Sequence, residues 1–545
     1  MATLSAEHAE ARRLEQAGRL PDAEAVYLEI LKRQPHDVAA LNLLGLLKHR
    51  QGRHGEAVDL IGRALALQPD DVQALANLGA VQMALGNRAA AIVSFRRAAA
   101  LAPRDAAAWR NLGLALLENH DARAAADAYR QALALDPNSP GGSQQLARAL
   151  FSAGDGDAAA EIYARIALAN PEQAENWNNL GAARHRAGDL AGAETALCEA
   201  LRLEAGNAAA WCNLGAVKND RGQDDEAIAS FSRAIEIEPD HVDAHVFRGT
   251  SLLRQGRFAE GWADYDWRLK QHRGPRVDRN FAQPRWRGED LAGKRLLVHA
   301  EQGLGDTIQF MRYLPLVKAR GGEVIFEVQP PLYRLIASSP ALQGIKVIAE
   351  GTPLPPFDLF CPLLALPGIF ATNLANIPGG IPYLAGDRSL FPALPPRRKQ
   401  RRWALVWAGN PRHPADRLRS LPGSALDRLD GLRDVEFISL QKAPAAKPDW
   451  LPLIDAAPLL ADFAVTAAVL AEVELVITVD TAVAHLAGAM GKPTWLLLPH
   501  VADWRWMNSR SDTPWYSSIG LYRQPQPGDW ASVIERIADE AAQGG

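Results

Sequence analysis

A 34-residue period runs through the first half of the chain and constrains its fold more than any other feature. Leu-Gly pairs recur at this spacing, with one gap of 68 residues that hides a degenerate copy; the glycines are Gly45, Gly79, Gly113, Gly181 and Gly215. A second glycine follows seven residues later in most copies, and proline closes most units. Small residues let paired helices pack closely, glycine between them allows positive φ, and proline ends the second helix. The period therefore predicts a stack of helical hairpins.

This motif resembles the tetratricopeptide repeat (TPR), with Trp109, Trp177 and Trp211 at its tryptophan position. We expect eight units over residues 4–272, beginning near residues 4, 38, 72, 106, 140, 174, 208 and 242. The last unit is degenerate, with Gly261 at the usual alanine position. Such an array usually stacks into a right-handed superhelix with a concave binding face.

One carboxamide per repeat lies two residues before the first glycine or its equivalent: Asn77, Asn111, Gln145, Asn179 and Asn213. Stacking would align them as a ladder, and a carboxamide can both donate to and accept from a peptide backbone. The ladder resembles that of the eukaryotic O-linked N-acetylglucosamine transferase, whose TPR groove holds protein substrates. Alternatively, these side chains form hydrogen bonds between repeats. We give both interpretations equal weight, and the first predicts a protein or peptide ligand in the groove.

Bulk composition excludes several classes of protein. The formal net charge of −4 provides no overall basic field, so we expect no nucleic-acid partner. No stretch approaches the roughly 20 apolar residues of a transmembrane helix, and the N-terminus lacks the apolar segment of a signal peptide. Cys198, Cys212 and Cys361 are widely spread, which fits a reducing compartment. We therefore expect a cytoplasmic protein.

Two breaks divide the rest of the chain. The period fails after Trp267, and residues 273–293 form a predicted connector in which Phe281, Trp286 and Leu291 pack. A second break, Pro392 to Arg402, carries a basic run. Because this run is short and lies midway through the second half, we favour a solvated hinge over residues 393–402 to a nucleic-acid patch.

The second half alternates predicted strands and helices in two lobes, residues 294–392 and 403–545. The predicted strands are Leu296–His299, Glu323–Val328, Ile345–Ile348, Phe357–Cys361, Trp403–Trp407, Val435–Leu440, Leu475–Val479 and Thr494–Leu498. A helix is predicted over Thr307–Arg320, and a last one over Trp530–Ala541, which we expect to brace the first lobe. The alternation predicts doubly wound parallel sheets with a cleft between the lobes.

Three motifs carry a family resemblance: Glu301-Gln302-Gly303-Leu304-Gly305-Asp306, Gly409-Asn410-Pro411, and Asp480-Thr481-Ala482-Val483-Ala484-His485-Leu486-Ala487. They resemble the bacterial heptosyltransferase-like group, glycosyltransferase family 9, and most of all its TPR-fused members. The resemblance covers roughly Phe281 to Ile537. It implies a GT-B fold of two Rossmann-like lobes, with the acceptor on the first lobe and a nucleotide-diphosphate sugar on the second. It also implies inversion at the sugar carbon, no catalytic metal and no cofactor.

The first motif supplies the predicted acceptor side. Asp306 matches the family's proposed general base, a role typically worth ~10²–10⁴ in rate; on spacing alone it would be a helix cap. Glu301 is the second candidate base, and Gln302 is a candidate for orienting the acceptor. Gly303 and Gly305 would let the backbone approach a ligand.

The third motif supplies the predicted donor side. Asp480 and Thr481 follow an apolar strand and precede a helix, whose N-terminus would favour a diphosphate. The resemblance places the donor's sugar and phosphates here, and His485 lies one turn further along. Because an aspartate beside a diphosphate is electrostatically unfavourable, we assign Asp480 to the sugar hydroxyls. The alternative is a capping Asp-Thr pair with His485 packed structurally.

Without a metal, the protein must supply cations to the departing diphosphate. The candidates are Arg417, Arg419 and Lys442. Arg419 comes first, because Arg419-Ser420-Leu421-Pro422 resembles the family's basic-residue-then-proline segment, although lysine is usual there. The remaining predicted donor contacts are Asn410, His413 and Gln441. The aromatic loops Asp503–Trp506 and Asp512–Tyr516 would stack a base or sugar, or pack the lobes together.

The sequence thus predicts a glycosyltransferase of hexosyl or heptosyl type whose TPR array recognises a protein acceptor or partner. The alternative from a different class is a TPR scaffold whose transferase-like lobes bind without turnover. A lipid-linked or cell-surface saccharide is the alternative acceptor. We favour a protein, because eight repeats offer more recognition surface than a small sugar needs.

Overall fold

The computed structural model describes residues 2–271, 279, 281–392, 394–411, 416–442, 445–448 and 452–543. The chain forms two compact units, Met1–Asn213 and Leu214–Gly545. Each is described separately below. Among the described residues, no helix is both long enough and apolar enough to cross a membrane.

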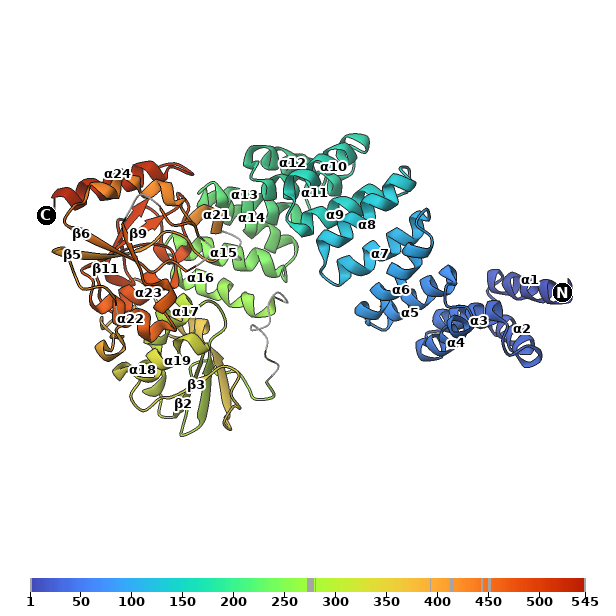
Figure 1. The fold of residues 1–545 in the computed structure, drawn as a ribbon, viewed down its shortest axis with the longest axis horizontal. Helices are drawn as coiled ribbons and strands as arrows, with labels where there is room; N and C mark the ends of the chain where they lie inside the picture. Colours follow the sequence, from blue (N-terminus) through green and yellow to red (C-terminus); the bar gives the residue numbers. More distant parts are fainter. Residues whose placement is uncertain are drawn as a thin grey trace. The chain divides into compact units, whose positions relative to one another are not determined.

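The first unit is a succession of helical hairpins (Figure 1). Its helices are α1 (Ala2–Gln16), α2 (Leu20–Arg33), α3 (Val38–Arg50), α4 (His54–Leu67), α5 (Val72–Ala84), α6 (Arg88–Leu101), α7 (Ala106–Glu118), α8 (Ala122–Leu135), α9 (Gly142–Ala153), α10 (Gly156–Ala169), α11 (Ala174–Ala187), α12 (Leu190–Leu203) and the first part of α13 (Ala208–Asp220). The first helix of each pair begins at, or within two residues of, a predicted start. The predicted repeat architecture is confirmed.

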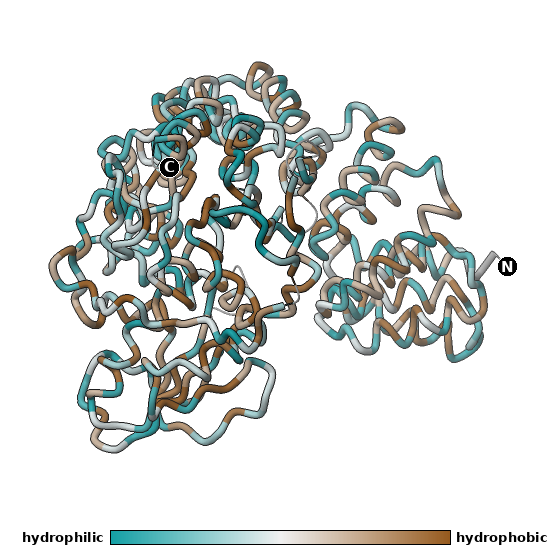
Figure 2. Tube along the Cα trace, turned by 60° about the vertical axis from the view of Figure 1, so that its left-hand side comes forward, coloured by the Kyte–Doolittle hydropathy of each residue, from teal (hydrophilic) through white to brown (hydrophobic). Residues whose placement is uncertain are grey.

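Each repeated residue type has a visible structural cause. Asp71 caps α5, accepting a hydrogen bond from the Ala74 N–H at 3.0 Å. A Cβ on Gly79 would approach the Phe95 ring to 2.6 Å, so only glycine lets α5 and α6 pack this closely. The turn glycines adopt positive φ, and in the copy that lacks one His120 takes φ 64° instead. Along the helices hydrophobic and hydrophilic residues alternate, as one buried face requires (Figure 2).

The second unit opens with the last hairpins, α14 (Asp224–Ile237), α15 (Val242–Arg254) and α16 (Phe258–Tyr265). The predicted TPR domain runs to residue 272, whereas the compact units divide inside α13. The reason is packing, because α16 contributes Phe258, Trp262 and Tyr265 to the same core as the α/β part. Trp262, for example, meets Trp504 edge-on with ring centroids 5.4 Å apart.

The first sheet has four parallel strands in the order β3-β2-β1-β4. They are β1 (Arg295–His299), β2 (Glu323–Val328), β3 (Lys346–Ala349) and β4 (Leu359–Pro362). The accompanying helices are α17 (Leu304–Phe310), α18 (Leu314–Lys318), α19 (Pro330–Ala337) and α20 (Leu366–Ile369). The predicted helix Thr307–Arg320 is therefore two helices, joined by a 3₁₀ turn at Met311–Tyr313 and followed by Pro315 near the start of α18.

The second sheet has the order β10-β11-β9-β8-β5-β6-β7 and is parallel except for the β10–β11 pair. Its strands are β5 (Arg401–Val406), β6 (Val435–Ser439), β7 (Leu453–Asp455), β8 (Leu475–Val479), β9 (Thr494–Leu498), β10 (Asp512–Thr513) and β11 (Tyr516–Arg523). Its helices are α21 (Asp416–Arg419), α22 (Phe463–Ala471), α23 (Ala482–Ala489) and α24 (Trp530–Gln543). The six parallel strands follow the strand order of dinucleotide-binding folds, whose ligands bind where that order reverses. Here that point lies between β5 and β8.

Helix α24 contradicts one expectation, because it does not brace the first lobe. Trp530, Ile534 and Ile537 pack instead in the core that covers β5 and β6, against side chains such as Trp403 and Phe437. The helix directly follows β11 of the same sheet, so the nearest apolar surface is the one it covers.

The two predicted breaks are ordered where they are described. Trp286 and Leu291 are fully buried, and the Phe281 ring packs on Phe360 at 5.2 Å; residues 272–278 and 280 of the connector lie outside the described part. In the basic run, Arg401 and Arg402 belong to β5 rather than to a hinge.

Three arginines of the basic run pair with neighbouring carboxylates. Arg401 pairs with Asp434 at 2.8 Å, Arg402 donates to Glu436 at 2.6 Å, and Arg397 pairs with Glu474 at 2.6 Å. The guanidinium groups are thus engaged within the protein.

Candidate functional site

A cleft of about 970 Å³ lies between the two sheets of the second unit. Its lining brings together most residues that the sequence predicted: Gln302, Gly303, Gly305 and Asp306 from the first lobe, and Asn410, Arg419, Gln441, Lys442, Asp480, Thr481 and His485 from the second. The strand topology explains this meeting. Gln302 follows β1, Asn410 follows β5, Gln441 follows β6 and Asp480 follows β8, and parallel strands present their carboxyl ends at one edge of a sheet.

Asp306 lies in the first turn of α17 and both of its carboxylate oxygens are engaged. Oδ2 accepts a hydrogen bond from the Gly303 N–H at 2.8 Å, which is the predicted capping contact. Oδ1 is ion-paired with the Arg505 guanidinium. Burial raises the pKa of Asp306 above its ordinary value, while Arg505 opposes that rise. The capping contact is thus present, and it leaves the carboxylate in the cleft.

Arg505 and Asp503 are cleft residues that the predicted site lacked. They lie in the 3₁₀ turn after β9, where Arg505 is 8% exposed and its Nη1 donates to Asp503 Oδ1 at 2.8 Å. Burial opposes the charge, but Asp306 and Asp503 together raise the pKa of Arg505 well above its ordinary value. The only signal for them in the sequence is that Asp503 and Arg505 carry opposite charges within an aromatic-rich loop.

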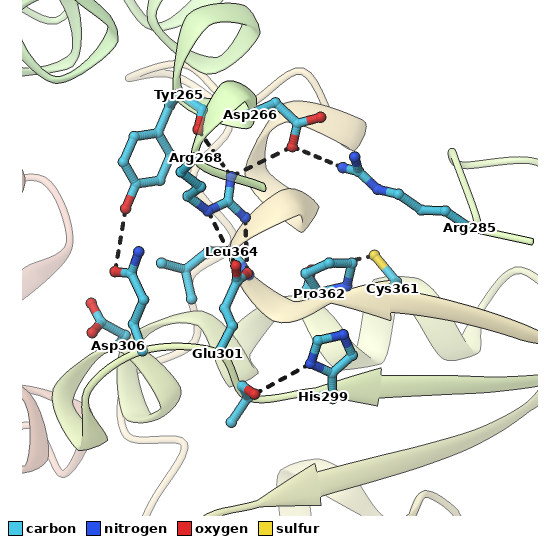
Figure 3. Close-up of polar contacts among 12 residues, drawn as sticks. Tyr265, Asp266, Arg268, Arg285, His299, Glu301, Asp306, Cys361, Pro362 and Leu364 are labelled. Atoms are coloured by element: carbon cyan, nitrogen blue, oxygen red, sulfur yellow. Dashed lines mark hydrogen bonds and ion pairs between the residues drawn. The ribbon is translucent and has the colours of Figure 1, made fainter. Parts of the chain in front are cut away.

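Glu301 is placed away from the cleft, contrary to the expectation of an acceptor-side base. Its carboxylate is fully buried and paired with Arg268 at 2.8 Å, and it also accepts from the Leu364 N–H at 2.8 Å (Figure 3). Asp266 takes another part of the Arg268 guanidinium, at 3.4 Å. Glu301 therefore joins the last helical hairpin to the first sheet.

The other first-lobe residues have mixed roles. Gln302 accepts a hydrogen bond from the Tyr265 hydroxyl at 3.3 Å through its side chain, and from Gln329 Nε2 at 2.9 Å through its carbonyl. A Cβ on Gly305 would lie 2.6 Å from His485 Cδ2. Gly305 therefore permits close packing of α17 on α23, and Gly303 is the glycine exposed to the cleft.

His485 is buried among aromatic side chains. Its Nδ1 lies 3.1 Å from the Tyr516 hydroxyl, and its ring stacks on Trp506 with centroids 5.1 Å apart. Burial, aided by Arg505, lowers the pKa of His485 to about 3. The imidazole is therefore neutral near pH 7, and much of its surface is used for packing.

Asp480 and Thr481 stand at the N-terminus of α23. Burial raises the pKa of Asp480 to about 6, with Asp503 adding to the rise and Arg419 opposing it. Thr481 occupies the N-cap, with its hydroxyl 3.2 Å from that of Thr478. Because Ala482 and Val483 also line the cleft, the first turn of α23 presents its backbone there.

The predicted cations separate into two groups. Arg419 is half-buried in the cleft, 3.3 Å from Asp416, and Lys442 is exposed there, donating to the Leu460 carbonyl at 2.7 Å. Arg417 is exposed on the same short helix but is not part of the described cleft lining. His413 lies outside the described residues.

Gln441 acts as a clamp within the second lobe. Its Oε1 accepts from the backbone N–H groups of Trp407 and Ala408 at 3.0 and 2.9 Å. Its Nε2 donates to the carbonyls of Ala408 and Lys442, both at 3.0 Å. These bonds fix the loops after β5 and β6, so its amide serves the shape of the cleft rather than a donor contact. Asn410 lies exposed at the cleft.

The carboxamide ladder shows bonding between repeats at two positions. Asn77 is buried and donates to Asn42 of the preceding repeat at 3.0 Å, and Asn213 donates to Asn178 at 2.9 Å. Asn111, Gln145 and Asn179 are half-buried. The bracing interpretation thus holds for Asn77 and Asn213, and peptide binding by the ladder stays a prediction.

The aromatic loops pack the unit together. Trp504 contacts Tyr265 and Phe310 with centroids 5.7 and 6.2 Å apart, and Trp515 contacts Phe258 at 6.2 Å. This is the packing alternative of the two predicted for these loops. In the described ranges, no group of three or more His, Cys, Asp or Glu side chains could hold a metal ion.

Tetratricopeptide repeat models match residues 8–72, 76–140, 116–183 and 208–241. These segments are tetratricopeptide repeats. Over 326 residues the chain is 27% identical to Protein FlbA of Caulobacter vibrioides, covering 53% of each protein. The chain therefore spans about half the length of this curated relative, whose name states no activity.

Three solved structures illustrate the likeness to known TPR proteins. A TPR protein from Parabacteroides merdae gives a TM-score of 0.33 at 16% identity, covering 46% of this chain and 100% of that one. YrrB, described as a TPR protein with an unusual peptide-binding site, gives 0.30 at 19%, covering 34% and 96%. MamA from Desulfovibrio magneticus gives 0.29 at 20%, covering 32% and 97%.

Proposed function

We propose that the α/β part is a glycosyltransferase of GT-B architecture that moves a sugar from a nucleotide-diphosphate donor to an acceptor hydroxyl. One observation carries the proposal. A single cleft has a carboxylate, Asp306, on one side, and on the other a helix N-terminus at Thr481 with cations at Arg419 and Lys442. A base facing a leaving-group site is what such a transfer needs.

The donor side follows from the second sheet. In sheets of this strand order, nucleotides bind at the point where the order reverses, and the cleft lies at that point between β5 and β8. The first turn of α23 offers backbone N–H groups to a diphosphate, and the helix dipole favours its charge. Arg419 and Lys442 supply positive charge as the diphosphate leaves. Asp480 accepts hydrogen bonds from sugar hydroxyls.

The acceptor side follows from the first sheet. Asp306 takes the proton of the acceptor hydroxyl while that oxygen attacks the sugar carbon opposite the departing diphosphate, which inverts the configuration. Each carboxylate oxygen has two lone pairs, so the contacts with Gly303 and Arg505 leave room for that proton. The chemistry needs no metal, because fixed cations and the helix N-terminus take its place.

The TPR array recognises the acceptor or a partner of the enzyme. Its many repeats offer an extended surface suited to a protein or peptide rather than to a small sugar. A lipid-linked or cell-surface saccharide is the alternative acceptor. Transfer assays on a panel of candidate proteins, peptides and saccharides distinguish the two kinds of acceptor.

The test is a thermal-shift screen of nucleoside-diphosphate sugars, followed by donor hydrolysis and transfer assays with and without EDTA. We expect at least one donor to raise the melting temperature and to be consumed in EDTA. Donor binding without hydrolysis or transfer to any acceptor would favour a scaffold whose lobes have lost turnover. Turnover lost in EDTA and restored by magnesium or manganese would contradict the metal-independent mechanism.

A further inference from the structure

Arg505 occupies the point where three parts of the second unit meet. Its guanidinium pairs with Asp306 on α17 and with Asp503 in its own turn, and the Arg505 backbone N–H also donates to Asp503 at 3.0 Å. The side chain is 9% exposed and lines the cleft. Its Nε has no hydrogen-bond partner among the described residues. Arg505 is thus a buried cation aimed at the proposed base.

Aromatic rings fix the place of this guanidinium. Arg505 lies over the Trp504 ring at 4.4 Å and the Phe310 ring at 5.8 Å. Trp504 packs edge-on against Trp262 and Tyr265 of the last TPR hairpin, with centroids 5.4 and 5.7 Å apart. The last TPR hairpin therefore packs against Trp504, the residue that positions the Arg505 guanidinium.

A second anchor follows three residues later in the same loop. The Asn508 backbone N–H donates to the Arg254 carbonyl at 3.3 Å, and its side chain donates to Asp224. Asp224 is itself buried in an ion pair with Arg254. The loop that carries Arg505 is thus held at both ends by α14, α15 and α16.

Burial and two nearby carboxylates disfavour the charged form of Asp306. Burial raises its pKa, and Asp503 and Glu301 add to the rise, although Glu301 is paired with Arg268. Tyr265 from α16 also faces Asp306, and burial raises the pKa of that phenol, so it carries no charge near pH 7. On α23, His485 is neutral near pH 7. Asp480, across the cleft, is a further acidic group that faces Asp306. Arg505 opposes the rise in the pKa of Asp306, and the Gly303 N–H does so to a smaller extent.

We propose that Arg505 is the positioning residue of the transfer reaction, which holds Asp306 ionised and aimed at the acceptor hydroxyl and is itself seated by the last TPR hairpins. This inference rests on the proposed function, in which Asp306 is the base. Arg505 need not touch the substrate, because it acts through the carboxylate.

The test compares Arg505→Met, which keeps an apolar stem against Trp504 but removes the charge, with Arg510→Met. Arg510 lies in the same loop and pairs with Asp512 at 2.8 Å, so it is a matched control outside the cleft. Turnover of a donor found in the nucleotide-sugar screen is measured from pH 5 to 9. Removing an opposite charge at contact distance typically moves a carboxyl titration by about one to three pH units.

In Arg505→Met, we expect the acid limb of the pH profile of kcat to move to higher pH by that amount, while donor Kd is unchanged. Arg510→Met should behave like wild type. An ionised base works above its pKa and loses activity as pH falls through it, so a raised pKa moves the limb upward. Arg505→Lys keeps the charge without the planar fork. We expect it to keep the limb near its wild-type position with kcat lowered about tenfold.

An unmoved limb in a folded Arg505→Met would overturn the proposal. If that variant does not fold by circular dichroism, Arg505→Lys decides, and wild-type kcat in it contradicts a positioning role. Carbon-13 NMR titration of labelled aspartate, with Asp306 assigned from Asp306→Asn, reads the same ionisation without turnover. It therefore separates failure of this inference from failure of the proposed function. Equal Asp306 titration in wild type and Arg505→Met would refute the inference.

Discussion

The TPR array and the cleft hold their polar groups in opposite ways. In the array, neutral carboxamides bond to carboxamides one repeat away, as Asn77 does to Asn42. In the cleft, ionised groups from distant parts of the chain meet, and Asp306 and Arg505 are separated by 199 positions. A neutral hydrogen bond contributes only about 0.5–1.5 kcal/mol, whereas uncovering one member of a buried ion pair costs far more. Single substitutions should therefore act weakly among the carboxamides of the array and decisively in the cleft.

The largest effect is expected for Asp306→Asn, which keeps the shape of the side chain but removes the proposed base. Turnover should fall by about 10²–10⁴, while donor Kd stays unchanged because the proposed diphosphate site is on the other lobe. Stopped assays of donor consumption and titration calorimetry measure the two quantities. Asp529→Asn, at an exposed cap of α24, controls for loss of a helix cap. Near-normal turnover in Asp306→Asn would leave Asp306 with its capping role alone.

Glu301→Gln should act on stability rather than on chemistry. It leaves the buried Arg268 with Asp266, at 3.4 Å, in place of its closer partner, and breaking a buried pair of this kind costs about 3–5 kcal/mol. Urea unfolding followed by tryptophan fluorescence should show the second unit destabilised by that amount, with turnover per folded molecule preserved below the transition. A folded variant of normal stability that had lost turnover would return Glu301 to a catalytic role.

Arg419→Ala and Arg417→Ala compare two cations on one short helix. Arg419 lines the cleft and Arg417 is not part of its described lining, so only Arg419→Ala should weaken the binding of a nucleoside diphosphate. A hydrogen bond to a charged group contributes about 1.5–3 kcal/mol, which corresponds to roughly 10- to 150-fold in Kd. The affinity for a nucleoside monophosphate should fall less, because it lacks the outer phosphate. Equal losses for both nucleotides, or for both variants, would show that Arg419 does not face the outer phosphate.

The smallest effects belong to the ladder. A double-mutant cycle of Asn42→Ala and Asn77→Ala should give a coupling of about 0.5–1.5 kcal/mol in the unfolding of the first unit. Donor hydrolysis should not change, because the cleft lies in the second unit. Zero coupling, together with weaker binding of an acceptor peptide in the Asn77 variant, would favour the peptide-binding interpretation over bracing.

Local repetition explains why the array could be predicted so closely. Contacts there join residues of the same repeat or of neighbouring repeats, so Gly45 reports its own environment through its copies. The strands β1, β2, β5, β6, β8 and β9 were also predicted, since buried parallel strands are continuous apolar runs. The short edge strands β7 and β10 and the strand β11 were missed, because they show no such run.

The cleft was predictable only as far as strand ends could be recognised. Asp480 and Asn410 follow strands directly, and the topology brings them together. Glu301 follows β1 as well, but its pairing with Arg268 depends on how the last hairpin packs, which no local pattern reveals. Arg505 was overlooked for the same reason, since its partner Asp306 belongs to the other lobe.

The most direct test of the central claim is release of nucleoside diphosphate from a panel of nucleotide sugars by wild type and by Asp306→Asn. We predict that one or a few donors stabilise both proteins equally on heating, that wild type consumes them, and that the variant does so about 10²–10⁴ times more slowly. If no donor binds either protein, or if the two proteins release diphosphate at the same rate, the cleft is not a transferase site that uses Asp306 as its base.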